Sequence, residues 1–247
     1  MSVLPVKVPP VVACVYISGY REDDPFPSEA QKAYDAARRG DRLSLQRLLS
    51  AQPGLLSYTA ESGETLLQRA LALGDKKAFR NLLRAGANPE QAGLENWSVI
   101  HDAARARDPY WLKTLLSAGI DPNGPSAPLY DLPPIGKSLP IGIALMSNNG
   151  PHFALLLEAG ADVNLADAMG NTVLHLAAQI NQPRHVLTLL KAGADPNARN
   201  AQGQTFQRYL WMTKEQLLNE QTRKGRKAVV EFLQQNGIPV QPAEGEQ

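Results

Sequence analysis

Residues 167–197 read DAMGNTVLHLAAQINQPRHVLTLLKAGADPN, and this stretch decides the fold. Thr172 precedes an apolar run, where its hydroxyl suits the N-cap of a helix. A second helix is expected from Gln182-Pro183, because proline is favoured in the first turn. Gly193 follows the pair Leu189-Leu190 and is expected to end that helix, since glycine adopts the left-handed conformation at little steric cost. The stretch therefore predicts two short helices.

The leucine pair and its glycine recur along the chain. They stand at Leu82-Leu83 with Gly86, Leu115-Leu116 with Gly119, Leu156-Leu157 with Gly160 and Leu189-Leu190 with Gly193. Successive glycines are 33, 41 and 33 residues apart, so one repeat holds additional residues. A fixed period of this size predicts stacked units, each of which buries its apolar face only against its neighbours. We expect both leucines of each pair on that buried face, and Leu116 in the core. A stack of this kind favours binding over catalysis.

The repeat resembles the ankyrin repeat, whose pattern is Gly-x-Thr-Pro-Leu-His-x-Ala-Ala followed by Leu-Leu-x-x-Gly-Ala-x-x-Asn. The resemblance implies an all-α fold, an ankyrin-repeat solenoid of stacked helix-turn-helix units with short hairpin loops. The repeats are expected at about residues 30–59, 60–92, 93–124, 134–165, 166–199 and 200–240, which make one domain over 30–240. Three further segments are expected: an N-terminal arm at 1–29, an insertion at 124–138 and a disordered tail at 241–247.

Composition limits the classes of partner. The net charge is +1, from 25 basic and 24 acidic residues. This balance gives no reason to expect a nucleic-acid partner, because phosphate binding relies on an excess of Lys and Arg. The sequence has no run of about 20 apolar residues, the length that a membrane-spanning helix needs. With Cys14 as the single cysteine, no intrachain disulfide can form.

The N-terminal arm is compatible with two cellular compartments. Residues 11–14, Val-Val-Ala-Cys, resemble the lipobox that precedes the acylated cysteine of bacterial lipoproteins. Pro9 and Pro10 interrupt the apolar run that a secretory signal requires, which favours an arm or strand packed on the first repeat. The expectation is a cytoplasmic protein, with a periplasmic protein that is lipid-anchored at Cys14 as the alternative.

The histidines do not form a catalytic or metal-binding pattern. His101 and His175 occupy the histidine position of the ankyrin pattern, where the family uses the ring to link adjacent hairpin loops. His152 and His185 have no acidic or cysteine neighbour at ligand spacing. The sequence also has no phosphate-binding glycine loop, Gly-x-Ser-x-Gly elbow or His-Glu-x-x-His pair. We therefore expect no metal, no cofactor and no enzymatic activity.

The resemblance implies a binding surface. In ankyrin proteins, the residues around the glycine of Gly-x-Thr and those after the Ala-Ala pair line the concave face. Transferred by position, the candidates are Glu61, Ser62, Glu64, Leu94, Glu95, Trp97, Arg105, Met146, Met169, Asn171, Gln179 and Ile180. Glu61, Glu64 and Glu95 would give this face an acidic side that suits a basic partner.

Trp97 is the central candidate. A hairpin tip that projects from the stack has no structural need for an indole, and Trp and Arg are enriched among residues that dominate interface energy. The alternative is that Trp97 packs on Tyr130 or Leu132 of the insertion. Four prolines limit the freedom of that insertion and lower the cost of ordering it on binding. Tyr130 and Leu132 are therefore candidates themselves.

These observations predict a monomeric, non-catalytic scaffold that binds a protein partner. Its composition looks bacterial, and one role for such a protein is immunity against a toxin. The alternatives are a secreted effector or host-interacting adaptor and, least favoured, an unrecognised enzyme. A short basic run, Arg223, Lys224, Arg226 and Lys227, is expected to be a solvated helix start, or else a contact for an acidic partner.

Overall fold

The computed structural model describes residues 25–124 and 139–241. The chain forms two compact units, residues 1–127 and 128–247. Most of the N-terminal arm, including Cys14, lies outside the described residues. So do nearly all of the insertion, with Tyr130 and Leu132, and the tail beyond residue 241.

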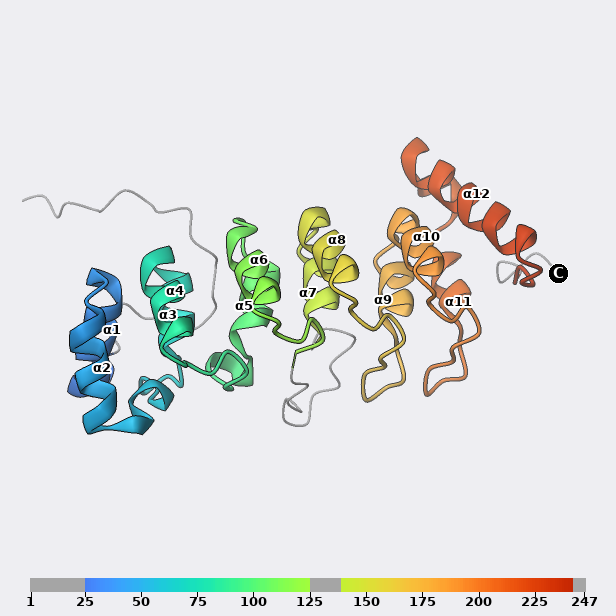
Figure 1. Ribbon diagram of the computed structural model, residues 1–247. Helices are drawn as coiled ribbons and strands as arrows, with labels where there is room; N and C mark the ends of the chain where they lie inside the picture. Colours follow the sequence, from blue (N-terminus) through green and yellow to red (C-terminus); the bar gives the residue numbers. More distant parts are fainter. Residues whose placement is uncertain (1–24, 125–138, 242–247) are drawn as a thin grey trace, which may run out of the picture. The chain divides into compact units, whose positions relative to one another are not determined.

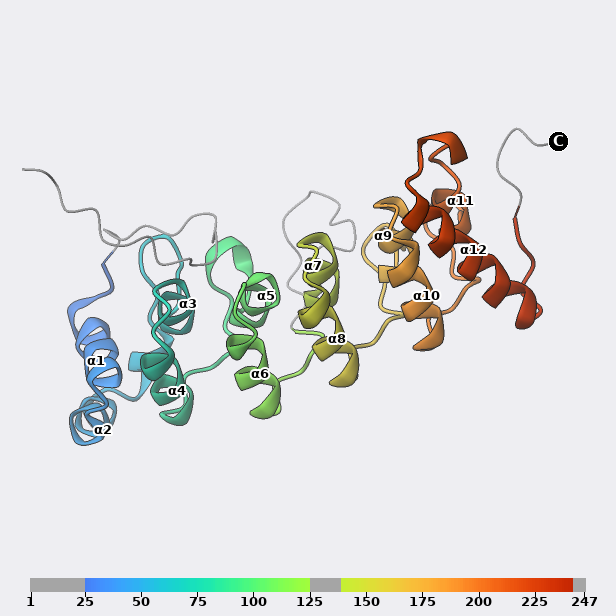
Figure 2. The same cartoon turned by 90° about the horizontal axis from the view of Figure 1, so that it is seen from above.

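The regular elements of the described residues are helices, most of them arranged as consecutive pairs (Figures 1 and 2). The first unit holds α1 (Ser28–Arg39), α2 (Arg42–Ala51), η1 (Pro53–Ser57), α3 (Leu66–Ala72), α4 (Lys76–Arg84), η2 (Leu94–Asn96), α5 (Val99–Arg105) and α6 (Tyr110–Ser117). The second holds α7 (Pro140–Met146), α8 (Gly150–Glu158), α9 (Val173–Gln179), α10 (Pro183–Lys191), α11 (Phe206–Leu210), η3 (Glu215–Leu217) and α12 (Glu220–Gln235). The all-α prediction is confirmed.

The helix ends follow the local sequence. Thr172 and Leu139 are the N-caps of α9 and α7, and Pro140 occupies the first turn of α7 as expected. Asp75 caps α4 by accepting a hydrogen bond from the Ala78 backbone N–H at 2.8 Å. After α10, Gly193 has a φ of 91°, the left-handed conformation that ends the helix with little strain.

The leucine pairs are buried unequally. Leu115 is fully buried, and so are the first leucines of the other pairs, Leu82, Leu156 and Leu189. Leu116 is half-buried, so its prediction as a core residue was wrong. Adjacent residues of a helix with 3.6 residues per turn point about 100° apart. The first leucine of each pair therefore points into the seam between repeats. The second lies at its margin for Leu83, Leu116 and Leu157, whereas Leu190 is also buried.

In both units helices of successive repeats pack against one another. In the first unit α1 packs against α4, and α3 packs against both α4 and α5. In the second unit α9 packs against α11 and α10 against α12. Gly225 of α12 allows this close approach, because a Cβ there would lie 2.8 Å from Cγ of Pro183. The expected solvated helix start does not hold for the neighbouring Arg226, which is buried and donates to the Thr213 carbonyl at 2.9 Å.

Hairpin loops precede several of the helix pairs. In three of them the backbone N–H of Ala60, Asp167 or Asn200 donates to a carbonyl four residues later, at 2.9–3.0 Å. Gly63, Gly170 and Gly203 form the tips with positive φ. In the loop before α5, Asn96 adopts the positive φ of 60° instead. The loops therefore share one backbone conformation, which positions the candidate binding residues.

Candidate functional site

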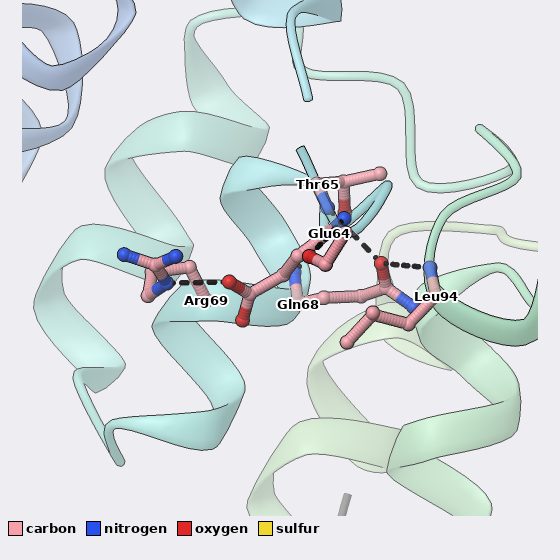
Figure 3. A network of polar contacts seen from close by, with 6 residues as sticks. Glu64, Thr65, Gln68, Arg69 and Leu94 are labelled. Carbon is pink, nitrogen blue, oxygen red and sulfur yellow. Dashed lines mark hydrogen bonds and ion pairs between the residues drawn. The ribbon is translucent and has the colours of Figure 1, made fainter. Parts of the chain in front are cut away.

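One buried glutamine joins the second and third repeats of the first unit. The Gln68 side-chain oxygen accepts from the backbone N–H groups of Thr65 and Leu94, each at 3.1 Å (Figure 3). Its amide nitrogen donates to the Trp97 carbonyl at 3.2 Å and to Asp102 Oδ2 at 2.8 Å. One side chain therefore bonds four polar groups, one in its own repeat and three in the next. Gln68 thus holds the hairpin that carries Trp97.

Sequence reasoning did not identify Gln68, although the signal was present. Gln68 precedes His101 by 33 residues, so it occupies the ankyrin histidine position of its own repeat. The two residue types make equivalent bonds. His175 Nδ1 accepts from the Thr172 N–H at 3.2 Å, and its Nε2 lies 3.1 Å from the Gln204 carbonyl of the next hairpin. The linking role expected for His175 is therefore confirmed.

Glu64 belongs to the interior of the first unit. Its carboxylate accepts from Arg69 Nε at 2.6 Å, and both side chains are buried (Figure 3). The Arg69 guanidinium lies over the ring of Phe26, 4.8 Å from its centroid. Because removing one partner from a buried ion pair leaves an uncompensated charge, the pair has a structural role. Glu64 therefore contributes no exposed carboxylate to the acidic face that the sequence predicted.

Two further candidates are buried. Leu94 is 6% exposed and Asn171 is 5% exposed, so neither presents appreciable area to a partner. The Asn171 side-chain oxygen accepts from Asn200 Nδ2 at 3.0 Å and thereby ties two hairpins together. Glu61 and Ser62 are exposed as expected. The side chain of Glu95 lies outside what the structure describes.

Trp97 and Arg105 form a stack on the first unit. The Trp97 indole is half-buried and stacks on the His101 ring, with centroids 5.8 Å apart and planes inclined by 26°. The Arg105 guanidinium lies 5.3 Å from the indole centroid, a cation–π distance. The indole is therefore packed on its own repeat and does not project freely, which differs from the expectation. Its predicted alternative contacts, Tyr130 and Leu132, lie outside the described residues.

The stack contains two unsatisfied donors. Trp97 Nε1 and Arg105 Nε are buried and have no hydrogen-bond acceptor within residues 25–124 and 139–241. The Arg105 side chain is 24% exposed, and its Nη2 lies 3.5 Å from Asp102 Oδ1. Because both donor atoms are buried, a partner can reach the stack only through the exposed part of the Arg105 guanidinium and the edge of the half-buried indole. These accessible groups make the stack the candidate contact of the first unit.

The candidates of the second unit lie at helix ends. Met146 ends α7 and is 44% exposed. Gln179 ends α9, and Ile180 is the C-cap of that helix; both are half-buried. Met169 is half-buried at a hairpin tip, and its carbonyl accepts from the Ala201 N–H at 2.8 Å. These side chains offer modest apolar area, with Met146 the most accessible.

No group of three or more His, Cys, Asp or Glu residues within the described ranges has a geometry that fits a metal ion. His185 contacts the Phe153 ring edge-on at a centroid distance of 4.8 Å. Burial lowers the pKa of His185 and also that of His175, where the bond to the Gln204 carbonyl offsets part of the effect. These rings are therefore neutral packing and linking groups near neutral pH.

His175 is expected to make stability depend on pH. Its pKa is lowered in the folded protein from an ordinary value of 6.5, so the unfolded chain takes up the proton first. Stability is then fully present above pH 6.5 and falls as the pH drops below it. Urea unfolding at neutral and mildly acid pH measures this loss. His175→Gln gives the fifth repeat the residue that the second repeat has at this position, Gln68. The variant should show a smaller change of stability with pH, and His185 should account for the change that remains. An unchanged slope in this variant would refute the assignment.

Known proteins share the repeats of this chain. Residues 132–200 match the family model described as ankyrin repeats in three copies. The chain is 33% identical over 163 residues to protein PhlB of Serratia liquefaciens, which covers 66% of this chain and 68% of PhlB. The chain belongs to the ankyrin-repeat family. It is also 29% identical over 154 residues to SH3 and multiple ankyrin repeat domains protein 2 of Homo sapiens, but spans only 8% of that protein.

Solved structures show the same ankyrin fold. The ankyrin repeat domain of Bcl-3 has a TM-score of 0.58 and 24% identity, with 84% of this chain and 86% of that chain covered. A chain from the complex of Bd0816, a predatory endopeptidase of Bdellovibrio bacteriovorus, with immunity protein Bd3460 has a TM-score of 0.58 and 22% identity. There, 80% of this chain and 97% of that chain are covered. Ankyrin repeats imply a protein partner, and the fold is typically a non-enzymatic scaffold. The helices that the structure describes are too short or too polar to span a membrane.

Proposed function

We propose that this ankyrin-repeat protein binds one protein partner through the Trp97–Arg105 stack and neutralises it, as an immunity protein does with a toxin. The stack carries the proposal. It combines an aromatic ring with a partly exposed guanidinium. Trp and Arg are the residues most enriched among those that dominate binding energy. A partner carboxylate or carbonyl on Arg105 would gain a charge-assisted hydrogen bond.

The neutralising role is supported by the relatives. A chain of similar fold occurs in a complex that contains a bacterial endopeptidase and an immunity protein. Protein PhlB, the 33% identical relative, is also bacterial. Within the second unit, exposed Met146 offers a flexible apolar contact, which suits adaptation to a partner surface.

Arg105→Ala should weaken partner binding by about 2 kcal/mol, because it removes the partly exposed cation of the stack. The tagged full-length protein would be used to capture its partner from the native cell, and the affinity of the captured partner measured by calorimetry. Trp97→Ala should weaken binding similarly, but it also removes packing against His101, so its thermal unfolding must be measured alongside. Lys191→Ala, at an exposed site on α10, is the matched control. Equal affinity of the Arg105 and Lys191 variants would contradict the proposed contact.

Neutralisation has its own test. The captured partner, expressed alone, should slow bacterial growth or show an enzymatic activity, and equimolar wild-type protein should suppress either effect. Arg105→Ala should require an excess. If the wild-type protein binds the partner tightly but leaves its activity unchanged, the protein is a scaffold without an immunity role.

A further inference from the structure

The outer helix of the second repeat carries an uneven charge. The α4 sequence, KKAFRNLLR, contains four basic residues and no acidic one. Two of the four are engaged: Lys76 forms an ion pair with Asp108 at 2.6 Å, and Lys77 donates to the Arg39 carbonyl. Arg80 and Arg84 are exposed and have no carboxylate partner among the described residues. Like charges four residues apart destabilise a helix by a few tenths of a kcal/mol. This arrangement is unfavourable for the free chain.

Two grooves border this pair of arginines. The first, of about 410 Å³, lies between α4 and α6. Leu83 and Ala118 contribute apolar surface to it, and Arg80, Arg84 and Lys113 supply cations. None of its lining residues is acidic. Lys113, like the arginines, is exposed and lacks a carboxylate partner within residues 25–124 and 139–241. The groove thus combines an apolar wall with three uncompensated positive charges.

The second groove arises from the way α1 packs on α4. It measures about 400 Å³ and is lined by α1, α2 and α4, with apolar surface from Ala37, Leu45 and Ala85. Arg84 lines this groove as well as the first, and Arg42 adds a second cation. Its one carboxylate, Asp41, is already the N-cap of α2 and accepts from the Ser44 N–H at 3.0 Å. Hydrogen bonding to the Ser44 side chain, and then to its backbone N–H, lowers the pKa of Asp41.

We infer that the face formed by these two grooves and the arginine pair, here called the α4 face, binds an acidic peptide segment of a partner protein. Carboxylates of the segment pair with Arg80 and Arg84, since guanidinium groups suit carboxylates in a bidentate geometry. An apolar side chain beside them fills the groove at Leu83 and Ala118. A phosphate polymer would use the charges but gain little from the apolar wall. The α4 face is separate from the Trp97–Arg105 stack, so either proposal can fail alone.

The inference is tested with the full-length protein and a labelled probe. The probe is a short fluorescein peptide of Glu, Asp and Leu, and its fluorescence anisotropy reports binding. We expect affinity to fall at least tenfold for Arg80→Glu/Arg84→Glu and also for a peptide in which Ser replaces each Leu. Arg80→Gln/Arg84→Gln gives a second, milder variant. Lys191→Glu/Lys214→Glu, a double charge reversal at exposed positions of the second unit, should leave the affinity unchanged. Circular dichroism confirms that each variant is folded.

Three outcomes would overturn the inference. One is no binding of the acidic peptide by the wild-type protein. Another is an equal loss of affinity in the Lys191→Glu/Lys214→Glu control, which would mean that overall charge governs binding. The third is binding of anionic phosphatidylglycerol vesicles, or of a short DNA duplex, that is as tight as that of the peptide and equally sensitive to the arginine variants. In that case the α4 face is a general polyanion site.

Discussion

Leu115→Ala is expected to lower the free energy of unfolding by about 2–5 kcal/mol, because a fully buried leucine leaves a cavity that its surroundings fill only partly. Leu115 lies in α6 and is completely shielded from solvent. Urea denaturation of the full-length protein, monitored by circular dichroism, measures the change. Because repeat proteins are stabilised by contacts between neighbours, the transition should also become less cooperative.

Leu116→Ala is the matched control for this prediction. It deletes the same atoms from the adjacent position of the same helix, but Leu116 is only half-buried. The loss should therefore be clearly smaller than for Leu115. An equal loss of unfolding free energy in the two variants, or a larger loss for Leu116→Ala, would show that α6 is rotated so that Leu115 does not face the core.

This pair of leucines shows how far the sequence determines the fold. The 33-residue period and the glycines of the repeat predict the helix pairs and their ends, because each depends on local chemistry. The period does not distinguish Leu115 from Leu116. Both are apolar, and the difference in their burial depends on how one repeat is rotated against the next. That rotation is a property of packing and is not encoded in any single repeat.

The candidate site was less predictable than the fold. The family pattern led to Trp97 and Arg105, which the structure brings together in one stack. It also led to Glu64 and Asn171, which the chain uses internally for an ion pair and a link between hairpins. A pattern of positions indicates which residues lie near a hairpin, but not which of them find a partner within the protein. The basic α4 face could not be predicted from the net charge of +1, because acidic residues elsewhere in the chain balance its positive charges.

The α4 face is basic, whereas the binding face predicted from the sequence was acidic. Sequence reasoning predicted an acidic hairpin face against a basic partner, with Glu61, Glu64 and Glu95 as its members. Glu64 is buried, whereas Arg80, Arg84 and Lys113 are exposed cations that line one groove without a carboxylate partner among the described residues. The first unit therefore presents exposed cations on the α4 face in addition to the exposed carboxylate of Glu61.

Gln68→Ala is expected to lower the free energy of unfolding by about 3 kcal/mol, although Gln68 is polar and its replacement is a good helix former. The substitution removes the Gln68 bonds to the N–H of Leu94 and the carboxylate of Asp102, and one of the two bonds of the Trp97 carbonyl, which also accepts from the Gly93 N–H. Each buried group that loses its partner costs about 1–3 kcal/mol, and more if it is charged. The measurement is urea unfolding, with Gln46→Ala, at an exposed helical position of the same unit, as a control of near-zero effect.

Gln68→His distinguishes the hydrogen bonds from the loss of volume. A histidine at this position can accept from the Thr65 N–H and donate to the Trp97 carbonyl, as His175 does with Thr172 and Gln204. It lacks the second amide hydrogen that reaches Asp102 and the second acceptor lone pair that serves Leu94. Its stability should therefore fall between those of the wild type and Gln68→Ala. If Gln68→Ala and Gln46→Ala are equally stable, Gln68 does not hold the Trp97 hairpin. The stack of Trp97 with Arg105 would then have to be positioned by the hairpin backbone alone.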